Sequence, residues 1–374
     1  MAPPACKGAV VAATSLWKRL AGLLGSLLAV GGAKAADLPP DETDAMVHVY
    51  DGGGVRASGP VLLVRKKLAD RVSVSGQYYV DMVSNASIDV VTTASPYKET
   101  RNEFTLGADY AYRDSVLTVS GSSSREPDYT ANTLNFDVTQ EVFGGMTTVA
   151  MGFTRGSDKV RKHGDDTFQD TAHHWRYRLG ATQILSPRWL MSANFEAVSD
   201  EGFLGSPYRV ARVFGAAVPE RNPRTRTSRA IKFRTIAEVT PGTAVRAEYR
   251  YFWDTWAIKA HTAEFGASRY VRQAWLVDGL LRFYSQQHAL FYSDNAAAET
   301  AYVSRNRQLG TYKGVSLGGK VTYSMGKVQG RYDVKLSGVY ERMRYRFSDF
   351  TDIRTGALYS YDANLLQLIV SATF

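Results

Sequence analysis

Cysteine is almost absent from this chain, since Cys6 is the only one in 374 residues. It lies in an N-terminal segment with the features of an export signal. We therefore expect the mature chain to have no disulfide, no thiolate metal site and no cysteine nucleophile. After that segment the sequence has no run of about 18 uninterrupted apolar residues, which excludes membrane-spanning helices.

A strong net charge is also lacking. Lys7, Lys18 and Arg19 form the basic part of the expected signal, residues 21–30 form its short apolar part, and residues 33–35 fit a cleavage site. We predict a signal peptide at residues 1–35. Its removal takes away four basic residues and no acidic one, so the net charge falls from +9 to +5. This modest excess argues against nucleic acid as a partner.

What the sequence does contain is a period-two alternation of apolar and polar residues. In residues 102–112, for example, Phe104, Leu106 and Tyr110 alternate with polar residues. This pattern is typical of strands with one apolar and one polar face. The same pattern fills the last ten residues and ends on Phe374. We interpret them as the closing strand of a barrel and Phe374 as the insertion signal that the barrel insertion machinery recognises.

The joins between alternating segments are short and long in turn. Short joins stand at 69–70, 113–114, 144–145, 187–188, 241–242, 272–273 and 326–327, and mostly longer ones at about 83–101, 124–131, 156–170, 200–227, 253–257, 292–308 and 347–360. Such alternation is typical of the periplasmic turns and extracellular loops of outer-membrane barrels. The strands would lie near 45–51, 56–68, 71–82, 102–112, 115–123, 132–143, 146–155, 172–185, 189–199, 228–240, 243–252, 258–271, 274–291, 309–325, 328–346 and 361–374.

We therefore predict a transmembrane antiparallel up-and-down β-barrel of about sixteen strands over residues 45–374, in the outer membrane. A periplasmic lead-in would occupy residues 36–44. A soluble sandwich has the same alternation with its apolar face inward. The five tryptophans after residue 35 nevertheless lie near predicted strand ends, as a membrane-interface girdle requires.

Six segments carry a family resemblance: SIDVVTTASPYKE at 87–99, DEGFLGSPYR at 200–209, PRTRTS at 223–228, EYRYFWDTW at 248–256, KAHTAE at 259–264 and FYSD at 291–294. They resemble the bacterial outer-membrane family known as domain of unknown function 3570. The resemblance covers most of the mature chain and implies a barrel at the outer membrane. It implies no activity.

Three polar groups are candidates for chemistry. The polar stretch 163–174 can hold a divalent cation or be a solvated loop. His261 can pair with Glu264 or with a serine as a nucleophile's base, but no Gly-x-Ser-x-Gly motif accompanies it. The arginines at 221, 224, 226 and 229 suit lipopolysaccharide phosphates or a plain solvated loop. We expect no catalytic residue, no metal and no cofactor.

A second basic set faces the lumen by strand parity: Arg176, Arg178, Lys232, Arg234, Arg246 and Arg250. Acidic residues with inward parity include Glu238, Glu248, Asp109 and Asp137. Either these charges form an ion-pair network that stiffens the barrel, or the basic set is a wall that guides anionic solutes. Both interpretations stay open here.

The leading function is a porin-like channel for small hydrophilic solutes, anions among them. The alternative is a barrel plugged by its own loops that serves as a scaffold for a periplasmic or surface partner. Outer-membrane lipid and lipopolysaccharide would surround the barrel in either case.

Overall fold

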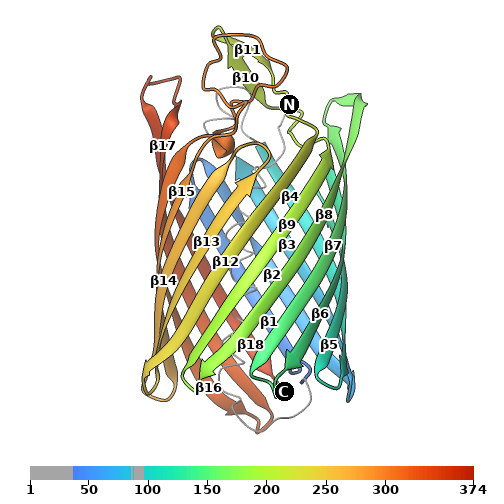
Figure 1. Cartoon of the computed structure of the whole chain (residues 1–374), viewed down its shortest axis with the longest axis vertical. Helices are drawn as coiled ribbons and strands as arrows, with labels where there is room; N and C mark the ends of the chain where they lie inside the picture. Colours follow the sequence, from blue (N-terminus) through green and yellow to red (C-terminus); the bar gives the residue numbers. More distant parts are fainter. Residues whose placement is uncertain (1–36, 86, 88–96) are drawn as a thin grey trace.

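The computed structural model describes residues 37–85, 87 and 97–374. Within them, sixteen strands close into one antiparallel barrel (Figure 1). The predicted fold class is therefore confirmed. The strands are β1 (Glu42–Gly52), β2 (Val55–Ala69), β3 (Val72–Asn85), β4 (Tyr97–Tyr112), β5 (Ser115–Arg125), β6 (Tyr129–Val142), β7 (Thr147–Lys162), β8 (Asp165–Ser186), β9 (Trp189–Gly202), β12 (Thr225–Thr240), β13 (Thr243–Asp254), β14 (Lys259–Val271), β15 (Trp275–Gln286), β16 (Tyr312–Val328), β17 (Tyr332–Thr351) and β18 (Leu358–Thr373).

The barrel closes where its first and last strands meet. β1 pairs with β18 from Glu42 opposite Thr373 to Gly52 opposite Ala363, and it pairs with β2 on its other edge. Each strand in the ring thus has two hydrogen-bonded neighbours. This satisfies the backbone groups that lipid cannot satisfy. Both ends of the barrel sequence lie at the rim that carries the short turns.

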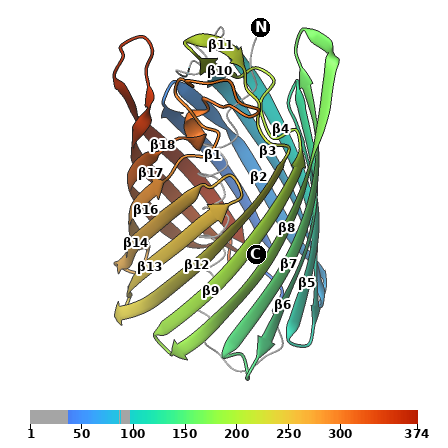
Figure 2. The ribbon, with the colours of Figure 1, turned by 45° about the horizontal axis from the view of Figure 1, so that its top comes forward.

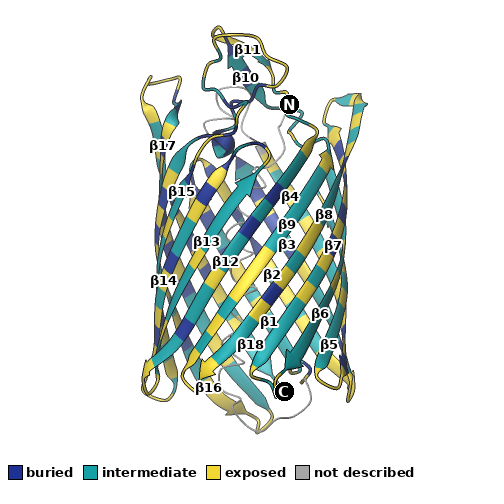
Figure 3. Cartoon of the chain, viewed as in Figure 1, coloured by how far each residue is buried: buried dark blue, intermediate teal, exposed yellow. Residues whose placement is uncertain are grey.

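The two faces of the barrel wall differ as the alternation predicts. On β3, Tyr78 and Met82 are exposed, whereas Tyr79 and Asp81 are buried. More and less exposed residues follow one another along single strands in Figure 3. The outward residues are apolar on nearly every strand, so the outer surface suits lipid and the inner surface is polar.

Several predicted boundaries are wrong. The predicted turn at 326–327 is a β-bulge, because the register shifts between Ser324 and Gly326 and β16 continues to Val328. The predicted loop 156–170 is mostly a long hairpin, since β7 runs to Lys162 and β8 begins at Asp165. The predicted strand 274–291 ends at Gln286, and β1 begins at Glu42, inside the predicted lead-in. The predicted signal peptide lies outside the described residues.

A cap lies over the end of the barrel that carries the long loops (Figures 1 and 2). It combines residues 203–224, which contain the hairpin of β10 (Val210–Val213) and β11 (Ala216–Pro219), with residues 287–311, which contain the short helix η1 (Arg307–Leu309). Backbone hydrogen bonds join the two parts, including both directions of the Arg221–Val303 bridge. The cap is therefore one structured unit.

No helix in the described part of the chain is long and apolar enough to cross a membrane. The predicted tryptophan girdle is only partly right. Trp189 and Trp275 begin strands and are exposed on the outer face, but Trp256 is 5% exposed beneath the cap. Trp256 lies just after β13, as the girdle pattern requires, but Ala289, Tyr292 and Leu309 of the cap pack against it.

Candidate functional site

The six predicted basic residues lie close together on the ring. β8 carries Arg176 and Arg178, β12 carries Lys232 and Arg234, and β13 carries Arg246 and Arg250. β9 lies between β8 and β12, so these strands are contiguous. The basic residues alternate with exposed apolar neighbours such as Tyr177, Phe233 and Tyr249, and they face the interior. We call this set the basic wall, and its role toward solutes stays a prediction.

Carboxylates hold most of the basic wall in place. Arg178 donates to Asp137 at 2.8 Å, and Lys232 lies 3.4 Å from Glu248. Arg176 and Arg250 each approach Glu196 at 3.8 Å. These contacts support the ion-pair network that the sequence left open, because each fixes a long side chain against the wall.

The basic wall continues beyond the predicted residues. On β15, Arg282 lies 3.1 Å from Glu264, and on β16 Lys320 stands opposite Asp278 in register. Sequence reasoning missed both, although the period of two marks each of them as inward. Away from the strand ends, inward basic residues on β8 to β16 outnumber inward acidic ones by eight to four: Arg176, Arg178, Lys232, Arg234, Arg246, Arg250, Arg282 and Lys320 against Glu196, Glu248, Glu264 and Asp278. Near the strand ends the inward charges are Arg226 and Lys327 against Asp170, Asp200, Glu238 and Asp254.

The opposite side of the lumen is acidic. On β1 to β4 the inward charges are Glu42, Asp44, Asp81, Glu99, Glu103 and Asp109 against Arg65, Lys67 and Arg101. We call these strands the acidic wall. Arg65 binds Asp109 at 2.6 Å, and Asp81 accepts from Tyr79 at 2.9 Å and contacts His48 at 2.6 Å. Asp81 is 1% exposed, so this cluster is enclosed.

The two walls face each other across the barrel. In the ring of sixteen strands, β3 is eight positions from β13, and β2 is eight positions from β12. Figures 1 and 2 likewise place β2 and β3 behind β12 and β9. Between the strand ends, the lumen therefore has an excess of positive charge on one side and of negative charge on the other.

The mouth beneath the cap holds a cavity of about 490 Å³. Arg226, Arg250, Phe252, Trp256 and Tyr284 line it, together with cap residues 203–207 and 306, 308 and 309. Its lining is thus both aromatic and charged. A solute that passes the cap on this side meets guanidinium groups and ring faces together.

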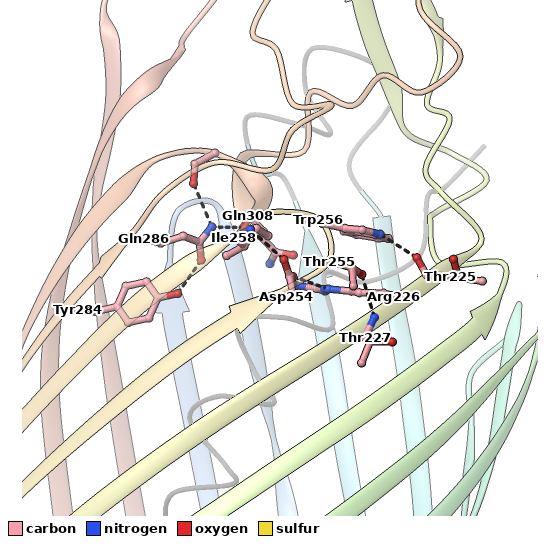
Figure 4. A network of polar contacts seen from close by, with 11 residues as sticks. Thr225, Arg226, Thr227, Asp254, Thr255, Trp256, Ile258, Tyr284, Gln286 and Gln308 are labelled. Carbon is pink, nitrogen blue, oxygen red and sulfur yellow. Dashed lines mark hydrogen bonds and ion pairs between the residues drawn. The ribbon is translucent and has the colours of Figure 1, made fainter.

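A hydrogen-bond network fastens this mouth (Figure 4). Arg226 donates to Asp254 at 2.8 and 2.5 Å and lies 4.6 Å from the centre of the Trp256 ring, whose indole donates to the carbonyl of Thr225 at 3.0 Å. Gln286 donates to the carbonyl of Gln308 at 2.8 Å. The network ties β12 to β13 and to the loop after it, and Gln286 ties β15 to the cap, so the cap is anchored to the barrel wall.

Further contacts fix the cap on the other side. Tyr208 donates to Asp128 and accepts from the backbone of His163. Burial and the bond to Asp128 raise the pKa of the Tyr208 phenol. Arg224 donates to both oxygens of Asp170 at 2.8 Å, and these bonds lower the pKa of that carboxyl.

Two other predicted groupings are wrong or changed. His261 lies on the outer face with Tyr249, at 2.6 Å, whereas Glu264 faces the lumen, so they do not pair. Three residues along a strand place two side chains on opposite faces. In the polar stretch 163–174, His174 belongs to β8 and binds Asp200 at 2.7 Å and Asp158 at 3.2 Å. Among the residues the structure describes, no group of three or more His, Cys, Asp and Glu side chains is placed to hold a metal ion.

The predicted arginine cluster is also dispersed. Arg221 contacts Glu299 at 3.6 Å in the cap, and Arg224 and Arg226 bind the carboxylates described above. Arg226 and Arg229 belong to β12 rather than to the loop. This cluster is therefore not one phosphate-facing surface.

Comparison with known proteins identifies the family. The model described as "Protein of unknown function (DUF3570)" matches residues 88–342. No curated protein matches the chain.

Solved structures share the architecture. A bacterial polysaccharide outer membrane secretin is 8% identical with a TM-score of 0.52, covering 90% of this chain and all of that one. The siderophore receptor PirA from Pseudomonas aeruginosa is 11% identical with a TM-score of 0.46, covering 84% of this chain. The CymD monoaromatic hydrocarbon channel is 10% identical with a TM-score of 0.43, covering 90% of this chain and 89% of that one. This chain spans 60% of the receptor's length. At such identities the likeness concerns the fold alone.

Proposed function

The chain belongs to the DUF3570 family of proteins of unknown function, and we propose that it is an outer-membrane channel for small hydrophilic solutes, with a preference for anions. The location is supported by the closed barrel with an apolar outer face, because that architecture leaves no unpaired strand edge in lipid. Passage of a solute through the barrel needs no covalent step.

The observation that carries the proposal is the opposition of the basic and acidic walls. Barrels of sixteen to eighteen strands are wide enough for an aqueous channel. In such a channel, low-dielectric walls focus the field of fixed charges and raise the local concentration of counter-ions. An anion would pass along β8 to β16, and the acidic wall would draw the positive end of a dipolar solute to the other side.

The ion pairs contribute to this mechanism by keeping the charges in place. Ion pairs with Asp137 and Glu248 fix the charged ends of the Arg178 and Lys232 side chains. A fixed charge orients a passing solute without the cost of ordering a mobile side chain. The excess of basic over acidic groups, rather than each paired arginine, then sets the preference for anions.

The cap favours a second candidate function. Its two parts are bonded to each other, and Gln286 and Tyr208 bond it to the wall. A cap that stays closed would make the barrel a plugged scaffold, whose cap presents a surface to a partner protein.

Single-channel recording separates the two functions. The purified full-length mature barrel is inserted into a planar bilayer in 0.1 M salt, and conductance and reversal potential are measured. A channel conducts, and its reversal potential across a salt gradient has the sign that anion selectivity gives. If no conductance is found, a variant with Gln286→Ala and Tyr208→Phe is recorded to loosen the cap. Conductance that appears only in this variant supports the plugged scaffold, and a non-conducting variant refutes the channel.

A further inference from the structure

A cluster of basic side chains lies on the outer face of the barrel, away from the lumen. On β17, Arg342, Arg344 and Arg346 are exposed, and they alternate with the buried or half-buried Met343 and Tyr345 of the inner face. On β16, the exposed Lys313 stands directly opposite Arg346 in register. We call these four residues the outer basic cluster.

The cluster lies just above an apolar surface. The outward residues nearer the short-turn rim are Leu336 and Tyr340 on β17 and Leu366, Leu368 and Val370 on β18, all exposed. From Tyr332 at the rim to Arg342, the strand rises roughly 25 Å along the barrel axis, taking about 3.3 Å per residue and a tilt of about 40°. The apolar band of such barrels is about 25 Å tall. The cluster therefore begins where the hydrocarbon ends and the headgroups begin.

One carboxylate orients the cluster. Asp362 on β18 accepts from Arg344 Nε at 2.7 Å and Nη2 at 2.9 Å, and from Arg342 Nη2 at 2.8 Å. Both arginine side chains remain more than half exposed, so their other N–H groups point to solvent. The side chains of Lys313 and Arg346 have no hydrogen bond or ion pair with any described residue. Four cations thus share a single anion.

We propose that the outer basic cluster binds the phosphate groups of a lipopolysaccharide headgroup, with the acyl chains on the apolar surface below. Guanidinium forks match phosphate oxygens in pairs, and the carboxylate of Asp362 holds two forks side by side. A free phosphate would use the cations alone, whereas a phosphorylated lipid uses both the cations and the adjoining apolar surface. The assignment rests on the outer-membrane location proposed above.

The test uses the purified full barrel in detergent, with bound lipid counted by native mass spectrometry. The probes are bisphosphorylated lipid A, dephosphorylated lipid A, phosphatidylglycerol and inorganic phosphate. The variant carries Arg342→Ala, Arg344→Ala and Arg346→Ala. The matched control carries Arg155→Ala, Lys159→Ala and Arg161→Ala, which removes the same charge from the outer face of β7. We expect Kd for bisphosphorylated lipid A to rise about tenfold or more in the variant and to stay unchanged in the control.

Each other outcome contradicts the proposal. Equal affinity for dephosphorylated lipid A refutes phosphate recognition, equal affinity for phosphatidylglycerol refutes lipopolysaccharide as the ligand, and displacement by millimolar phosphate assigns the site to the free ion. A similar loss in the β7 control shows a general effect of charge. If the triple variant fails to fold, the pair Lys313→Ala and Arg346→Ala, which breaks no bond, takes its place. Lipid binding needs no conductance, so a barrel that does not conduct refutes the channel function and leaves the lipid site standing. Fractionation of the protein outside the outer membrane refutes only the proposed location.

Discussion

Removing two charges from the basic wall should weaken the preference for anions. We choose Arg176→Gln with Arg234→Gln, because neither has a close contact with a carboxylate. Arg176 is 3.8 Å from Glu196, and Arg234 stands opposite Glu248 in register with no closer ion pair among the described residues. The change lowers the basic excess on β8 to β16 without uncovering a tightly bound acid, so the barrel should keep its fold.

The expected size follows from Coulomb's law. One charge changes the energy of a monovalent ion about 7 Å away by about 0.6 kcal/mol in water, and salt at 0.1 M screens this by about half. Two charges then give about 0.6 kcal/mol. Anions and cations shift in opposite directions, so the permeability ratio should change by about 1.2 kcal/mol, or about sevenfold.

The assay is the reversal potential of single channels across a salt gradient, at 0.1 M and again near 1 M. The difference between variant and wild type should fade at high salt, where the screening length falls to about 3 Å. Arg188→Gln with Arg272→Gln removes the same charge from the short turns after β8 and β14 and should leave the potential unchanged. A cation preference in the wild type, or an unchanged potential in the lumen variant, would show that the wall is purely structural.

Three further outcomes are expected. Gly59→Ala should prevent barrel closure, because its Cβ would lie 1.9 Å from the carbonyl oxygen of Val80, as judged by loss of the heat-modifiable band on gels. Deleting Phe374, which packs 5.7 Å from the Tyr332 ring, should lower the outer-membrane level and leave protein in the periplasm. In a Cys6→Ser background, Glu299→Cys in the cap should react with an impermeant maleimide on intact cells, and Arg188→Cys in a short turn should not.

Each of these predictions has a control or an outcome that would contradict it. Gly279→Ala has no atom within 4 Å of its Cβ and should fold normally, so equal damage from both glycine variants would remove the steric argument. Phe374→Tyr should insert well, since a terminal aromatic remains, and normal insertion of the deletion would refute the insertion signal. Labelling at residue 188 but not at 299 would reverse the topology.

The sequence alone determined the barrel, its sixteen strands and the inward set of charges. Lipid demands apolar side chains on one face of each strand, and a period of two then assigns every residue to a face. Arg176, Lys232 and Arg246 could be placed inward from their neighbours alone. The same rule, had it been applied to them, would have excluded the pair of His261 and Glu264 that the sequence analysis allowed, and it would have added Arg282 and Lys320.

Only the tertiary structure decided which charges meet. Arg178 reaches Asp137 across Gly152, whose position opposite both residues depends on the register of two hairpins. The acidic wall faces the basic wall because the first and last strands pair, a contact between residues more than 300 positions apart. The cap buried Trp256 in the same way. Local alternation carries no information about ring position or about long loops, because both depend on closure and on contacts between distant segments.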